Sequence, residues 1–171
     1  MTMRAMGRAA LAVLVVATVA GCSGGGTPQT QSTPAAAANI LAGCGPVSDQ
    51  AIAGQLRATS VRRESAPTTC TWIAQTPSGT IDISYSWFSG DVLMRETQVA
   101  AQYGYSIEKV VVDRFGAMYW RDPQDPSSCG VTAADGGTVT WWVQNRDRAA
   151  QPDPCPAAMS LMHTTLTFDG I

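Results

Sequence analysis

Cys22 is the residue whose surroundings indicate a definite chemistry. It follows Val19, Ala20 and Gly21 at the end of an apolar run, in a pattern that matches a bacterial lipobox. The small residues fit the narrow site of a lipoprotein signal peptidase, and the thiol is the nucleophile that receives a diacylglyceryl group before cleavage. The alternative is an ordinary secretory signal with an incidental cysteine. We expect Cys22 to become the lipid-modified first residue of the mature chain, held in a membrane by acyl chains such as palmitate.

The other four cysteines are expected to form two disulfides, because an exported chain with an even number of cysteines is typical of an oxidised, stapled domain. Four cysteines allow three pairings. Pairing in chain order would close two loops of 26 positions each, and each bond would add about 3–4 kcal/mol in the chain-entropy model. A zinc site is disfavoured, because no two of them have C-x₂₋₄-C spacing and one histidine is present. These cysteines are Cys44, Cys70, Cys129 and Cys155.

No catalytic constellation is recognisable in the sequence. His163 is the only histidine, so any Ser-His-Asp or Cys-His arrangement would have to use it, and no G-x-S-x-G elbow is present. We therefore expect no enzyme activity, no cofactor and no metal. Two carboxylates brought together by folding remain the alternative, since a hydrolase of envelope polymers could use such a pair. Lys109 is the only lysine and the net charge is −2, so nucleic-acid binding is not expected.

Three tryptophans are candidates for contact with a ligand or partner. Trp141 and Trp142 are consecutive in a predicted strand, so their side chains must point to opposite faces of a sheet. Trp120 lies in a neighbouring predicted strand. An exposed tryptophan on a sheet would suit ligand or partner contact. The alternative is that helices cover both faces of the sheet and that all three belong to the core.

The chain divides into three segments. Residues 1–21 are predicted to be a lipoprotein signal peptide, with Arg4 and Arg8 before eleven apolar residues, which is shorter than the roughly 20 that cross a bilayer. Residues 22–39 comprise the lipidated cysteine and a linker without large apolar side chains, whose reach is about 20–25 Å. Residues 40–171 are long enough for one folded domain.

The elements expected within the domain follow the order α-ββ-α-ββββ-α. Residues 80–88 give the clearest strand, because Ile81, Ile83 and Tyr85 alternate with polar residues. Hairpin-linked strands with helices between them predict an α+β fold, an antiparallel sheet packed by helices. The helices are expected at 48–56, 91–103 and after Asp153; the strands at 69–75, 80–88, 107–112, 116–121, 129–134 and 138–144.

Several short patterns resemble those of mycobacterial cell-envelope lipoproteins of the LprB and LprC type, and of a larger actinobacterial lipoprotein domain family of unknown function. The resemblance covers about residues 43–166 and implies an exported, membrane-anchored domain with two disulfides paired in chain order. It carries over no catalytic residue and no ligand. The patterns are GCGPVSD at 43–49, CTW at 70–72, SYSW at 84–87 with Gly90 leading to Arg95-Glu96, and CGV at 129–131 before DPC at 153–155.

These features together predict a lipoprotein on the extracytoplasmic face of a bacterial cell membrane. Its domain would be a non-catalytic binding or accessory module, for a small apolar ligand or an envelope protein. A hydrolase with paired carboxylates is the main alternative, and a purely structural surface protein is a third.

Overall fold

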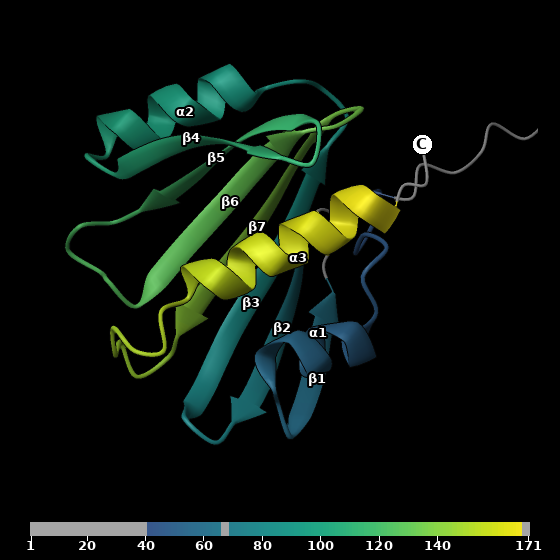
Figure 1. The fold of residues 1–171 in the computed structure, drawn as a ribbon, viewed down its shortest axis with the longest axis vertical. Helices are drawn as coiled ribbons and strands as arrows, with labels where there is room; N and C mark the ends of the chain where they lie inside the picture. The colour runs from purple at the N-terminus through teal and green to yellow at the C-terminus, as the bar shows by residue number, and fades with distance from the viewer. Residues whose placement is uncertain (1–40, 66–68, 169–171) are drawn as a thin grey trace, which may run out of the picture. The chain divides into compact units, whose positions relative to one another are not determined.

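Residues 41–65 and 69–168 form an antiparallel sheet and three helices in a computed structural model (Figure 1). The predicted signal peptide, Cys22 and the linker lie outside the described residues. The elements in chain order are α1 (Asp49–Leu56), β1 (Ser60–Ser65), β2 (Thr69–Thr76), β3 (Gly79–Phe88), α2 (Leu93–Gln102), β4 (Ser106–Val112), β5 (Phe115–Arg121), β6 (Ser128–Ala134), β7 (Thr138–Asn145) and α3 (Cys155–Phe168).

The sheet has seven strands in the order β1-β2-β3-β7-β6-β5-β4, and every neighbouring pair is antiparallel. It consists of two meanders, β1 to β3 and β4 to β7, joined in the chain by α2. The last strand of the second meander pairs with the last strand of the first, so that Tyr85 of β3 lies opposite Trp141 of β7. The predicted α+β fold is confirmed.

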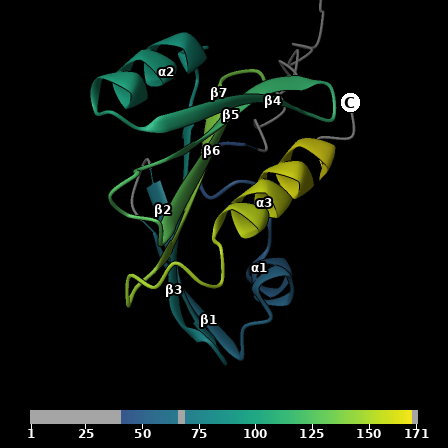
Figure 2. The same ribbon diagram turned by 60° about the vertical axis from the view of Figure 1, so that its left-hand side comes forward.

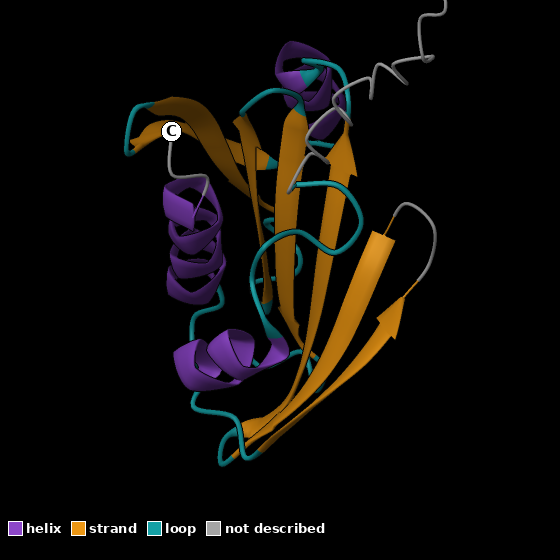
Figure 3. Ribbon diagram, turned by 90° about the vertical axis from the view of Figure 1, so that its right-hand side faces the viewer, coloured by secondary structure: helices purple, strands orange, loops and turns teal. Residues whose placement is uncertain are grey.

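The helices lie on both faces of the sheet. Helices α1 and α3 cover one face, and α2 lies on the other, over β4, β5 and β6 (Figures 2 and 3). The main core is under α1 and α3, where Trp72, Tyr85 and Trp141 are fully buried. Their rings contact one another, with centroids 5.5 Å apart for Trp72 and Trp141 and 4.9 Å for Tyr85 and Trp141.

The polar atoms of these buried rings are all hydrogen-bonded, as burial without a large penalty requires. The Trp141 indole donates to Thr165 Oγ1 of α3 at 2.8 Å, and the Trp72 indole donates to Asp49 Oδ1 of α1 at 2.8 Å. The Tyr85 hydroxyl donates to the Leu41 carbonyl at 2.6 Å. These bonds fix both helices and the start of the domain to the same face.

Both helices on this face begin at the side chains that the sequence indicated. The Ser48 hydroxyl accepts from the Ala51 amide at 3.1 Å and starts α1. The Asp153 carboxylate accepts from the Cys155 amide at 3.0 Å and starts α3. Helix α2 begins in the same way, because the Asp91 carboxylate accepts from the Leu93 amide at 3.2 Å. Of its residues Ala100 alone is buried, and Met94 and Val99 are exposed.

The two disulfides join Cys44 to Cys70 and Cys129 to Cys155, as the resemblance implied. The first ties the segment before α1 to β2. The second ties β6 to the first residue of α3.

One strand was not predicted. Strand β1, SVRRES, pairs with β2 at the edge of the sheet, where β2 supplies the hydrogen bonds. Val61 is its one apolar side chain and packs against the core, whereas Arg62, Arg63 and Glu64 are exposed. A strand held by edge pairing needs no apolar alternation, so the sequence carries no signal for it.

Candidate functional site

A hollow on the described part of the domain lies between α1, the beginning of α3 and the sheet. It has a volume of about 640 Å³, within the range of small-molecule sites. Leu56, Ile81 and Val143 are its apolar lining from α1 and the sheet. Proline rings supply more apolar surface, and they come from the turn between β2 and β3 and from the segment that leads into α3: Pro77, Pro152, Pro154 and Pro156. We call this the proline hollow.

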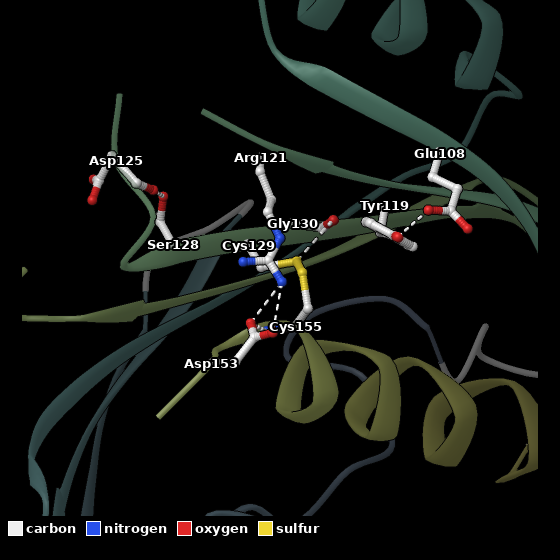
Figure 4. The surroundings of a disulfide bond; sticks show 9 residues. All are labelled: Glu108, Tyr119, Arg121, Asp125, Ser128, Cys129, Gly130, Asp153 and Cys155. Atoms are coloured by element: carbon white, nitrogen blue, oxygen red, sulfur yellow. Dashed lines mark hydrogen bonds and ion pairs between the residues drawn. A yellow bond between two sulfur atoms is a disulfide. The ribbon is translucent and has the colours of Figure 1, made fainter. Parts of the chain in front are cut away.

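The wall of the proline hollow formed by residues 152–156 is fixed to the sheet by covalent and polar bonds. Arg121 Nη2 of β5 donates to both carboxylate oxygens of Asp153, at 2.6 and 2.8 Å, beside the Cys129–Cys155 disulfide (Figure 4). The buried Asn145 side chain donates to the carbonyls of Ala149 and Pro152, both at 2.8 Å. The hollow is thus held open by its own scaffold, which lowers the ordering cost of binding.

One polar atom of the proline hollow lacks a partner. Gln55 lines it and donates from Nε2 to Thr164 Oγ1 at 2.7 Å. The Thr164 hydroxyl hydrogen goes to the Ser160 carbonyl, so this hydroxyl can only accept from Gln55. The Gln55 Oε1 atom is therefore the free end of the amide, and it is buried with no hydrogen-bond partner. Because the atom has almost no accessible surface, a ligand with a hydrogen-bond donor would satisfy it once the Gln55 amide turns toward the hollow.

A second, smaller hollow of about 240 Å³ lies on the opposite face, between α2 and the sheet. Four aromatic side chains line it in a row: Tyr103, Tyr105, Trp120 and Trp142. Successive ring centroids are 6.1, 5.4 and 4.7 Å apart. Glu96, Val99 and Ala100 of α2 and Met118 of β5 complete the lining. We call this the aromatic hollow.

A glycine allows the tryptophans of this row to meet. Gly130 of β6 lies between Trp120 of β5 and Trp142 of β7 in the register of the sheet. A Cβ atom at position 130 would lie 2.4 Å from Trp120 Cε2, so only glycine leaves room for this indole to lie across β6. The Trp120 indole donates to Thr132 Oγ1 at 3.2 Å, which holds the ring in place.

The three tryptophans that the sequence singled out have different places. Trp141 is fully buried in the main core and lines neither hollow. Trp142 and Trp120 are half-buried, lie together on the α2 face and line the aromatic hollow. Sequence reasoning did not single out Gln55 or Tyr105, and it named Glu96 only as part of a family pattern. Their neighbours in space come from distant parts of the chain, so spacing carried no signal for them.

The residues considered for catalysis are dispersed. His163 is exposed on α3, with Nε2 3.4 Å from Asp113 Oδ1. Asp125 is the one buried acid among the described residues, and its partners are Ser127, Gln144 and Arg148 rather than a second acid. The Ser127 hydrogen bond, helped by the Arg148 charge, lowers the pKa of Asp125 although burial opposes this. A hydrogen bond to Glu108 raises the pKa of Tyr119.

Within residues 41–65 and 69–168, no three histidine, cysteine or acidic side chains form a group that could hold a metal ion. No helix in these ranges is long and apolar enough to cross a bilayer.

The family model described as "Protein of unknown function (DUF3558)" matches residues 17–167. No curated protein and no solved structure match the chain.

Proposed function

Since the chain belongs to the DUF3558 family of proteins of unknown function, we propose from its own structure that it is a non-catalytic binding module of the bacterial cell envelope. Its ligand is a small, mostly apolar molecule with one hydrogen-bond donor, and it binds in the proline hollow. The module is held at the extracytoplasmic face of the membrane by a lipid on Cys22. The resemblance to mycobacterial lipoproteins supports the same placement.

The observation that carries this proposal is the shape and lining of the proline hollow. An apolar ligand gains free energy in proportion to the apolar area that it removes from water, about 25 cal/mol per Å². Pro77, Pro152 and Pro156 are exposed and offer such area, whereas Leu56, Ile81 and Val143 form a floor that is already buried. The walls are already fixed. Gln55 Oε1 is a polar atom of the lining without a partner, and Arg57, Ser78 and Ser160 add polar groups at exposed positions. Lining of this kind is typical of sites that bind an apolar body and orient it by a few polar groups.

A titration with 1-octanol tests the proposal, because this molecule has an apolar chain and one hydroxyl donor. The protein is the exported full chain carrying Cys22→Ser, which keeps the domain free of its own lipid. We expect saturable binding of 1-octanol by calorimetry. Octyl methyl ether, which lacks the donor, is expected to bind roughly fivefold more weakly, since one hydrogen bond contributes about 1 kcal/mol.

Two matched variants locate the binding. Ser160 lines the proline hollow from an exposed position of α3, and His163 is exposed on the same helix outside it. Ser160→Trp is expected to fill the hollow and weaken 1-octanol binding by roughly tenfold or more, about 1.4 kcal/mol. His163→Trp is expected to leave binding unchanged. Equal effects of the two variants, or no saturable binding at all, would rule the proposal out.

The hydrolase alternative needs two facing carboxylates. Asp153 is the one acidic residue that lines the proline hollow, and its carboxylate is engaged by Arg121 and by the start of α3. No observation therefore favours a hydrolase over a binding module.

A further inference from the structure

We propose that the aromatic hollow is a second binding site, and that its ligand carries an alkylated ammonium group. The site lies on the α2 face and is independent of the proline hollow under α1 and α3. Three observations carry the proposal: the row of four aromatic rings, an acidic residue of the same lining with no partner among the described residues, and the lack of other charged groups in the lining.

The rings supply the first attraction. Aromatic faces carry negative charge density and attract organic cations, and several rings around one hollow are the common means of binding alkylated ammonium groups. Tyr103 is 74 % exposed at one end of the row, and Trp142 is half-buried at the other. Trp120 at the centre is held by Gly130 and Thr132 and stacks on Tyr105 and on Trp142, so its own faces are covered by those rings. Tyr103 at the exposed end is the ring most open to a ligand.

Glu96 supplies the second attraction. It is half-buried and lines the hollow from α2. Among the residues that the structure describes, none forms a hydrogen bond or an ion pair with its carboxylate. Glu96 lines the hollow together with the rings and has no countercharge among the described residues, and a cation in the hollow would provide one. No basic residue belongs to the lining.

The residues that line the aromatic hollow favour an alkylated ammonium ligand over a sugar or a neutral apolar molecule. A sugar ring brings several hydroxyl groups that each need a partner. Apart from Glu96, the tyrosine hydroxyls and the indole N–H groups are the only polar side-chain groups of the lining, and the Trp120 N–H is already bonded to Thr132. A neutral apolar molecule would leave the Glu96 charge uncompensated. An alkylated ammonium group combines an apolar surface with one positive charge, which matches both features.

The test compares choline with its neutral carbon isostere, 3,3-dimethyl-1-butanol, and includes tetramethylammonium as the bare cation. The full chain carrying Cys22→Ser is titrated at constant ionic strength, and the indole N–H signals of Trp120 and Trp142 are followed by NMR. We expect both cations to shift these two signals saturably and the isostere to bind roughly tenfold more weakly. The Trp72 signal, from the opposite face, is the internal control.

Variants at exposed or half-buried positions separate binding from folding. Glu96→Gln keeps the shape of the side chain and is expected to weaken choline binding by roughly fivefold. Glu64→Gln, on β1 at the opposite edge of the sheet, is the matched control and is expected to have no effect. Tyr103→Ala is expected to weaken binding, whereas Tyr103→Phe retains the ring and is expected to bind as the unchanged chain does.

Vesicles distinguish the source of the ammonium group. Retention of the chain on phosphatidylcholine vesicles but not on phosphatidylglycerol vesicles, with release by tetramethylammonium, identifies a lipid head group. Binding of free choline without such retention identifies a small soluble molecule, and both results support the site. Equal binding of choline and its isostere, or choline binding that survives Glu96→Gln unchanged, overturns it. So does the absence of shifts in a folded chain. None of these results bears on 1-octanol binding in the proline hollow.

Discussion

Asp125 is the one buried acid of the described residues, and its carboxylate is held by three partners. Its carboxylate accepts from Gln144 Nε2 at 3.0 Å and faces Arg148 Nη2 at 3.1 Å, and the Ser127 hydroxyl donates to its other oxygen. These contacts join the segment before β6 to the end of β7. Ser127 is two residues from Asp125, but Gln144 and Arg148 are distant in the chain, so the sequence gives no sign that this acid is buried.

Asp125→Asn is expected to lower the free energy of unfolding at pH 7 by about 1–3 kcal/mol, since a buried network loses its charge. The pKa of Asp125 is lowered in the folded state, so its contribution is complete above the unfolded pKa of about 3.9. It is lost as the pH falls through the lower, folded pKa. Urea unfolding of both proteins from pH 7 to pH 2 measures this.

The difference in stability between the two proteins should therefore shrink only in the acid range. If the difference in free energy of unfolding stayed constant down to the lowest pH, the shape of the Asp125 side chain rather than its charge would be responsible for the stabilisation. Asp122→Asn is the control, because this residue of the same segment is half-buried and its carboxylate accepts, among the described residues, from the Gln124 amide alone, so the change should affect stability less.

Among the elements, α3 is the one that joins the fold to the proline hollow. Its first residue is bonded to β6 by a disulfide, and the residue that caps it is bonded to β5 by Arg121. The equal separation of the two disulfides, 26 positions each, makes their effects on the unfolded chain equal. Their effects on the hollow are not equal, because only Cys129–Cys155 holds its wall.

Replacing either cysteine pair by alanine is expected to lower the free energy of unfolding by about 3 kcal/mol. The Cys129→Ala, Cys155→Ala chain should also bind 1-octanol more weakly, whereas the Cys44→Ala, Cys70→Ala chain should keep most of its affinity. Urea unfolding and calorimetry measure the two effects separately. Arg121→Gln, a milder change, should weaken binding in the same direction. Equal affinity of both disulfide variants for 1-octanol would contradict the role of the wall.

The elements themselves were largely predictable, for reasons that differ from one to another. Ile81, Ile83 and Tyr85 alternate because one face of β3 is buried, and Ser48 and Asp153 mark helix starts through their capping bonds. Strand β1 was not predicted, because its pairing at the edge of the sheet, rather than its sequence, makes it a strand. The hollows could not be predicted, because each combines side chains from segments that only the sheet order brings together. Trp120 and Trp142 were chosen from sequence, but their contact depends on the register at Gly130.

At the scale of the whole molecule, the predicted lipid on Cys22 would place both hollows close to the membrane surface. We expect the full chain made in bacteria to enter the detergent phase on Triton X-114 partition, and mass spectrometry of its first peptide to show acyl chains on Cys22. Cys22→Ser should move the chain to the aqueous phase, whereas Ser23→Ala should not. Continued detergent partition of the Cys22→Ser chain would rule out this anchor.

The five tryptophans of the chain are unevenly placed with respect to the two hollows. Trp120 and Trp142 line the aromatic hollow, and neither tryptophan nor tyrosine lines the proline hollow. Intrinsic fluorescence should therefore report ligand binding in the aromatic hollow but not in the proline hollow. A ligand on the α2 face should quench or shift the emission directly, while a ligand under α1 and α3 should leave the spectrum nearly unchanged. Comparing the emission with a label-free heat signal would assign an unknown ligand to one face without any mutation.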